Sequence, residues 1–193
     1  MKKIILCFLF AFWGLIVNAQ EFKWDVNAGY SIANNITKFN VLLSNPFSPG
    51  DPELQDPIIT SKNSEDSFFL GLGGRYLFSE KVGLTGHLNY ASYENTSFLQ
   101  IPVLVNYFFG SSGLNIQAGP QFTYLIKDLG NFEVYVNKLN IGAGAGLGYD
   151  ISKNLFVEAR YVFQLNDQYK KEINRPGESA KVNYLNIGLG YRF

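Results

Sequence analysis

The sequence predicts an all-β protein, an eight-stranded antiparallel up-and-down β-barrel whose strands cross a membrane. Three observations predict this fold class: apolar and polar residues alternate along most of the chain, tight turns alternate with longer connections, and the last eight residues, NIGLGYRF, keep the alternation as far as Phe193. Alternation with a period of two is typical of strands that have two different faces. Chain ends are usually polar and frayed, so an apolar last residue indicates that the final segment is one of the strands of the barrel.

The N-terminal segment has the pattern of a secretory signal peptide. A basic start, MKK, is followed by an apolar run from Ile4 to Val17 and by the small residue Ala19. The apolar run is shorter than the roughly 20 residues that a membrane-spanning helix needs. We therefore expect residues 1–19 to be cleaved after export, and residues 20–193 to form one barrel domain.

The composition of the exported part excludes several classes of site. The single cysteine of the full sequence, Cys7, lies in the predicted signal and is absent from the exported part. Neither a disulfide framework nor a thiolate metal site is therefore expected. His87 is the one histidine, which argues against a histidine-rich metal site. Removing Lys2 and Lys3 leaves 14 basic against 16 acidic residues, so no basic surface points to nucleic acid. We expect no cofactor, no metal and no nucleic-acid partner.

Eight segments with this alternation follow one another along the chain. In the clearest of them, Val157 and Tyr161 share an apolar face while Glu158 and Arg160 lie on the other face. Each segment is near or above the roughly 9 to 11 residues that a tilted strand needs to cross a bilayer. The expected strands are residues 23–32, 67–78, 82–92, 98–109, 114–126, 138–151, 155–165 and 182–193.

The connections between these segments alternate in length. Tight turns are expected at 79–81, 110–113 and 152–154, and the other connections are polar, at 33–66, 93–97, 127–137 and 166–181. Short turns on one side and loops on the other are typical of membrane barrels. Both chain ends lie on the short-turn side, so the first strand can pair with the last and leave no open edge. The acidic, proline-containing segment 33–66 is expected to be a solvated loop.

The two strand faces differ in a way that indicates which one meets lipid. The polar face is rich in Gly, Asn, Gln and Ser with few charges, whereas the surface of a soluble barrel normally carries many Lys and Glu. The apolar face has aromatic residues near both strand ends, among them Tyr90 and Tyr149, which resembles the aromatic girdles of a membrane barrel. We expect the apolar face outside and the polar face inside.

An eight-stranded barrel is just wide enough for side chains to fill its interior. Buried charges must be paired or hydrogen-bonded, so we expect Glu158 and Asp25 to neutralise some of the interior arginines. The glycines at 142, 144, 146 and 148 would make room for long side chains on one side. The interpretation is a structural polar plug, with a proton or ion path as the alternative. The predicted lumen network consists of Asp25, Arg75, His87, Glu158, Arg160 and Arg192.

Two parts of the sequence resemble a known family. The ending, with Gly188, Tyr191 and the final Phe193, resembles the terminal signal of bacterial outer-membrane proteins, and this implies recognition by the barrel-assembly machinery. SFLQIPVLVNYFFG followed by LNIQAGPQFTYLI resembles the small outer-membrane β-barrel family that includes PorT-like proteins. The resemblance implies the outer membrane of a Gram-negative cell, with lipid and lipopolysaccharide around the barrel and secretion or surface proteins as possible partners.

The expected role is non-enzymatic: a structural, adhesion or secretion-accessory barrel that acts through loops or partners, with no catalytic residues. Three alternatives remain open at this point. They are a narrow porin-like channel, a rim enzyme that modifies lipid with His87, and a soluble lipocalin-like carrier.

Overall fold

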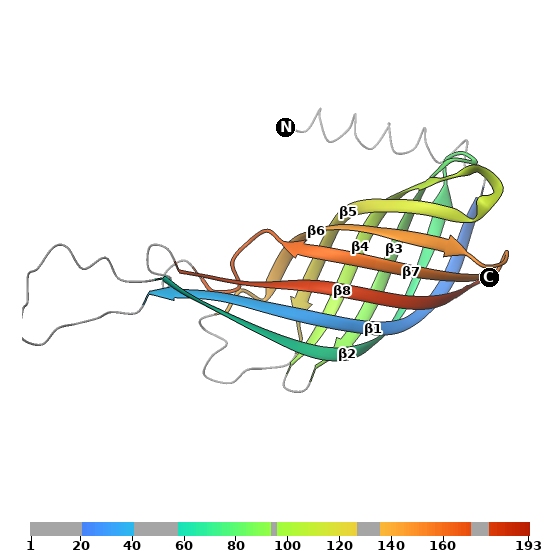
Figure 1. Ribbon diagram of the computed structural model, residues 1–193. Helices are drawn as coiled ribbons and strands as arrows, with labels where there is room; N and C mark the ends of the chain where they lie inside the picture. Colours follow the sequence, from blue (N-terminus) through green and yellow to red (C-terminus); the bar gives the residue numbers. More distant parts are fainter. Residues whose placement is uncertain (1–20, 41–57, 94–95, 127–135, 171–177) are drawn as a thin grey trace, which may run out of the picture.

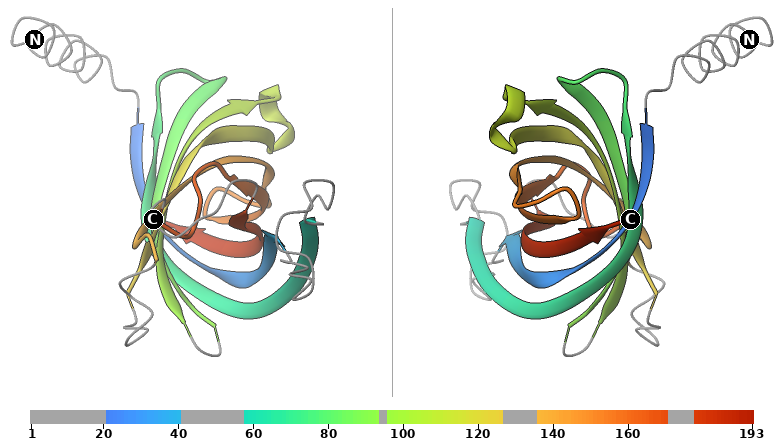
Figure 2. Two further views of the ribbon diagram at one scale, coloured as in Figure 1. Left: turned by 90° about the vertical axis from the view of Figure 1, so that its left-hand side faces the viewer. Right: turned by 90° about the vertical axis from the view of Figure 1, so that its right-hand side faces the viewer.

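The computed structural model describes residues 21–40, 58–93, 96–126, 136–170 and 178–193. Within them, eight strands form one closed antiparallel barrel in which each strand pairs with its chain neighbours and the last pairs with the first (Figure 1). Seen from either end, the strands curve round a single interior (Figure 2). The predicted fold class is confirmed. The predicted signal segment, residues 1–19, lies outside the described residues.

Most strand boundaries lie within three residues of those that the alternation predicts. The exceptions are the two strands that flank the long connection between residues 33 and 66. The strands are β1 (Glu21–Asn40), β2 (Ile58–Leu77), β3 (Val82–Ser92), β4 (Ser97–Phe108), β5 (Leu114–Leu125), β6 (Leu139–Asp150), β7 (Leu155–Gln164) and β8 (Ser179–Arg192).

The apolar face points outward, as the sequence predicts. Phe163 on β7 and Leu147 on β6 expose 54% and 55% of their surface. Arg160, on the opposite face of β7, exposes 1%. Bulky apolar side chains on the outside require a hydrocarbon environment, and this arrangement is the reverse of that in a soluble barrel for apolar ligands. No helix among the described residues is long and apolar enough to cross a membrane.

The first hairpin differs from the prediction. Residues 33–40 and 58–66, expected in a loop, continue β1 and β2 as a paired ladder that reaches Asn40 opposite Ile58. Beyond the barrel wall both faces of this hairpin meet water, so the apolar-polar alternation that marks the other strands is absent there. These residues can still form strands, but without an apolar face they lack the period-two pattern from which the other strands are predicted. Residues 41–57 lie outside the described part of the chain.

The short turns are fixed by glycine and serine. After β4, the 3-10 turn η1 (Gly110–Ser112) ends at Gly113, whose φ of 78° is favourable for glycine. Between β6 and β7, the Ser152 hydroxyl accepts hydrogen bonds from the backbone N–H groups of Asn154 and Leu155. These turns and the chain end lie at the same end of the barrel, which we call the turn end (Figure 1).

Candidate functional site in the barrel interior and the protruding sheet

The six predicted lumen residues all lie inside the barrel. Each exposes 7% of its surface or less, and five of the eight strands contribute them. Their contacts fall into a layer near the turn end and a middle layer, followed by an apolar layer towards the opposite, loop end. Asp25, Arg75, His87, Glu158, Arg160 and Arg192 make up this set.

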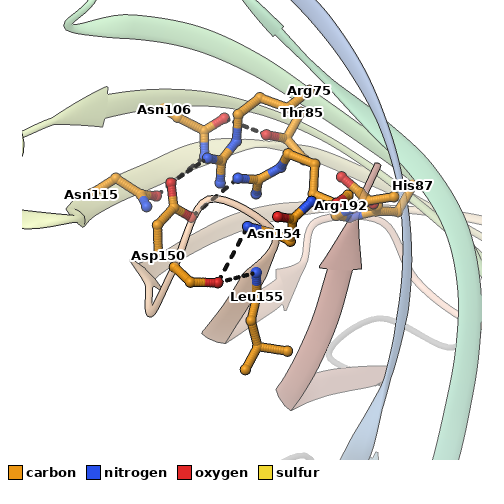
Figure 3. Close-up of polar contacts among 11 residues, drawn as sticks. Arg75, Thr85, His87, Asn106, Asn115, Asp150, Asn154, Leu155 and Arg192 are labelled. Atoms are coloured by element: carbon orange, nitrogen blue, oxygen red, sulfur yellow. Dashed lines mark hydrogen bonds and ion pairs between the residues drawn. The ribbon is translucent and has the colours of Figure 1, made fainter.

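The layer near the turn end is built around Asp150, which the predicted network omits. Arg75 Nη1 donates to Asp150 Oδ2 at 2.7 Å, and Arg192 Nη1 lies 3.4 Å from Asp150 Oδ1. Figure 3 shows both guanidinium groups directed at this carboxylate. Asp150 occupies the polar face of its strand beside the turn, and this position is the signal that could have identified it.

Two aromatic rings line the same layer. The Arg192 guanidinium carbon lies 4.6 Å from the ring centroid of Phe156, and that of Arg75 lies 4.9 Å from the centroid of Phe108. Cations over aromatic faces are stabilised electrostatically, more so where water is excluded. Phe108 and Phe156 lie on the lumen face despite being apolar, and Gly190 makes room for one of them, because a Cβ there would lie 2.1 Å from Phe156 Cζ.

Asp25 pairs with a different residue from the one expected. Its Oδ1 lies 2.8 Å from His87 Nε2, and neither side chain has exposed surface. The His87 ring also stacks on Phe156, with the centroids 6.5 Å apart and the planes 8° from parallel. Asp25 therefore contacts a histidine and attracts Arg192 only through space, while the carboxylate in contact with Arg75 and Arg192 is that of Asp150.

The middle layer holds the remaining predicted pair and several amides. Arg160 Nη1 lies 3.6 Å from Glu158 Oε1, as expected from the sequence. Nearer the turn end, Gly148 pairs with Asn115, and a Cβ at Gly148 would lie 2.7 Å from the Asn115 amide and would force it to move. Polar side chains therefore occupy the lumen beside the glycines of β6.

An apolar cluster closes the lumen towards the loop end, and the sequence reasoning missed it. Phe98 packs edge-to-face against Tyr93 and Tyr184, with centroids 5.7 and 6.4 Å apart. Phe98 and Tyr184 occupy the lumen face of β4 and β8, and Tyr93 directly follows β3, so apolar residues on the polar face near the loop end were the available signal. We call this set the loop-end plug: Ala33, Phe69, Ala91, Tyr93, Phe98, Leu125, Val136, Val162, Val182 and Tyr184.

Three strands continue beyond the plug as a protruding sheet. β8 pairs with β1 as far as Ser179 opposite Lys38, and β1 pairs with β2 to its end (Figure 1). β2 pairs with β3 only from Phe68 onwards. Among the described residues, the edge of β2 from Ile58 to Ser67 therefore has no strand partner. Ile58 and Ile59 on this edge are about half exposed.

A closed barrel with apolar residues outside and charged residues inside defines the class of protein: a transmembrane β-barrel of the outer membrane. Residues 94–170, which include β4 to β7, match the family model described as "Outer membrane protein beta-barrel domain". The match confirms the predicted resemblance and the predicted location in the cell outer membrane. The finer assignment to PorT-like proteins stays a prediction.

Several solved structures have folds similar to this chain, three of which are the following. Neisserial surface protein A (NspA) is 13% identical, covering 90% of this chain and all of its own, with a TM-score of 0.47. Ail of Yersinia pestis is 16% identical with the same coverage and TM-score. OprG of Pseudomonas aeruginosa is 14% identical, covering 91% of this chain and 98% of its own, with a TM-score of 0.42. No curated protein matches the chain.

Proposed function

We propose that this outer-membrane barrel is a non-enzymatic binding protein, whose protruding sheet adds an extended segment of a partner protein to the edge of β2. The observation that carries the proposal is the edge from Ile58 to Ser67, which stands beyond the barrel without a strand partner among the described residues. Such an edge presents a row of backbone donors and acceptors, and strand addition is a recurring mode of peptide recognition.

The length and chemistry of this edge fit a protein partner. Ten residues of extended chain span about 33 Å, enough for several ladder hydrogen bonds. The side chains of Ile58 and Ile59 offer apolar contacts at the far end, and Lys62 and Asp66 add one exposed charge of each sign along the edge. The loops of an outer-membrane barrel face the exterior, so the partner is a surface, secreted or host protein.

The interior supports a scaffold in preference to the alternatives. A channel needs a continuous polar path, and the loop-end plug is apolar across the lumen. A rim enzyme needs its histidine within reach of lipid, and the side chain of His87 has no exposed surface. Partners other than a protein segment, including lipopolysaccharide, are outcomes that the following test separates.

The test places a photo-crosslinking amino acid on the edge of β2 in intact cells. With the probe at Asn63, we expect a discrete adduct that contains a second protein, identified by mass spectrometry. The matched control carries the probe at Ser111 in η1, at the opposite end of the barrel. An adduct that contains lipopolysaccharide alone, or equal protein adducts from both positions, would contradict strand addition at this edge.

A further inference from the structure

A cavity of about 360 Å³ opens at the turn end of the barrel. Four basic side chains and two acidic ones line it, which gives the lining a net charge of +2. The basic residues are Lys23, Arg75, Lys153 and Arg192, and the acidic ones are Glu80 and Asp150. The short turns of an outer-membrane barrel face the periplasm, so this cavity is open to periplasmic solutes and to the inner leaflet rim.

The deepest cations of the cavity lack hydrogen-bond acceptors for part of their guanidinium groups. Arg75 and Arg192 share the single carboxylate of Asp150, and their side chains are only 8% and 5% exposed. Nε of Arg75 and both Nε and Nη2 of Arg192 have no hydrogen-bond partner among the described residues. A buried guanidinium needs a counter-charge and acceptors, because otherwise its lost hydration is not compensated. Asp25 also attracts Arg192 through space, but Asp150 is the carboxylate that both guanidinium groups contact, and these nitrogen atoms still lack acceptors among the described residues.

The two guanidinium groups are held in place before any ligand arrives. Phe156 lies under Arg192 at 4.6 Å and Phe108 under Arg75 at 4.9 Å. Asp150 accepts a hydrogen bond from Arg75 and lies within ion-pair distance of Arg192 (Figure 3). A planar guanidinium presents donors in a fork that matches the oxygens of a phosphate. Two such forks, with a lining charge of +2, favour a phosphate group over a singly charged carboxylate.

We propose that the turn-end cavity binds a phosphate group through Arg75 and Arg192. The group is either free, as in inorganic phosphate or a phosphate monoester, or the headgroup phosphate of a periplasmic-leaflet phospholipid. The chemistry is the same for both sources. The bound phosphate supplies the counter-charge that Asp150 alone does not, and it leaves the exterior sheet untouched.

Binding is measured on the full protein, purified in a phosphate-free maltoside detergent, by calorimetric titration with inorganic phosphate. We expect saturable binding at a single site that weakens by about tenfold or more in Arg192→Gln and in Arg75→Gln, since each removes a charge-assisted fork. Lys38→Gln removes an exposed charge from β1 in the distant protruding sheet and should leave the affinity unchanged. No binding by the wild type, or equal binding by all variants, would overturn the proposal.

Asp150→Asn should change the phosphate affinity in the opposite direction to the arginine variants. This measurement does not depend on whether the arginine variants fold. The change removes the carboxylate that competes for both guanidinium groups, so phosphate affinity should rise. Phosphate should also raise the unfolding midpoint of Asp150→Asn more than that of the wild type, because ligand binds the folded state. A purely structural ion pair predicts a destabilised variant without either phosphate effect, and that result would also refute the site.

A competition experiment identifies the source of the phosphate. Short-chain phosphatidylglycerol is added to the protein already saturated with inorganic phosphate, with a short-chain maltoside as the control amphiphile. Displacement of phosphate by the lipid and not by the maltoside supports a headgroup ligand. Retention of phosphate in the presence of the lipid supports a free anion. Both outcomes support a phosphate site, and they differ only in where the group comes from.

Discussion

Asp25 on β1 meets His87 on β3 across the intervening strand, with Oδ1 and Nε2 separated by 2.8 Å. The two residues are linked through the ladder by Gly73 of β2, which pairs with both. Because Gly73 has no side chain, the carboxylate and the imidazole can approach each other over its backbone. A buried polar contact between strands that are not neighbours restrains the curvature of the barrel at this point.

Replacing either partner alone should lower the free energy of unfolding by more than the interaction between the two side chains contributes. Asp25→Ala and His87→Ala each leave a buried polar group without its partner, and we expect each to cost about 3–5 kcal/mol in the free energy of unfolding. The double variant should cost less than the sum, with a coupling of about 1 kcal/mol or more. Urea unfolding in lipid vesicles measures all three values, and strict additivity would show that the contact contributes nothing.

Gly73 lies beneath this contact, and Gly86 on the adjacent strand, at a position on the outer face, serves as its control. A Cβ at Gly73 would lie 2.0 Å from His87 Cδ2 and 2.3 Å from a backbone oxygen, whereas a Cβ at Gly86, the residue before His87 on β3, meets nothing within 4 Å. Gly73→Ala should therefore lower stability by about 1–3 kcal/mol through overpacking.

Gly86→Ala should be neutral or slightly stabilising, since glycine is unfavourable inside a strand. Heat-modifiable migration on a denaturing gel shows whether both variants fold, and urea unfolding gives the difference. Equal effects at both positions would mean that backbone freedom, and not the space over Gly73, decides the outcome.

The sequence predicts the barrel wall well because every wall strand has one face in hydrocarbon and one in the lumen. Val157 against Arg160 is enough to orient β7. The extension of β1 and β2 could not be predicted in the same way, since water covers both of its faces. The pairing of Asp150 with Arg75 was also out of reach, because it depends on which strands face each other across the lumen, 75 residues apart in the chain.

The loop-end plug predicts an absence of ion conduction. In planar bilayers, the wild type should give no conductance steps above those of the lipid alone, because an apolar layer excludes hydrated ions. Phe98→Ala should cost about 3–5 kcal/mol of stability, as for a large buried aromatic. Phe39→Ala, on the exposed protruding sheet, serves as the control and should cost far less. Stable single-channel steps from the wild type would show that the lumen is open.

The C-terminal residue gives the last prediction, which separates recognition from stability. Phe193 is 68% exposed on the outer face, packs edge-to-face on Tyr191 at 5.3 Å, and donates its N–H to the Trp24 carbonyl at 2.9 Å. The side chain is therefore at the β1–β8 seam but buries little surface within the protein. Phe193→Ala keeps the backbone hydrogen bond that closes the barrel and removes only the ring.

We expect Phe193→Ala to lower the folded, heat-modifiable fraction in cell outer membranes severalfold. The reason is that the assembly machinery would no longer find the terminal aromatic residue that it recognises. Purified Phe193→Ala, refolded into vesicles without that machinery, should keep a stability close to that of the wild type. Tyr169→Ala, an exposed aromatic outside the terminal strand, should behave as the wild type in both settings. If Phe193→Ala were equally impaired in vesicles and in cells, the ring would act through folding of the seam, and the ending would not serve as an assembly signal.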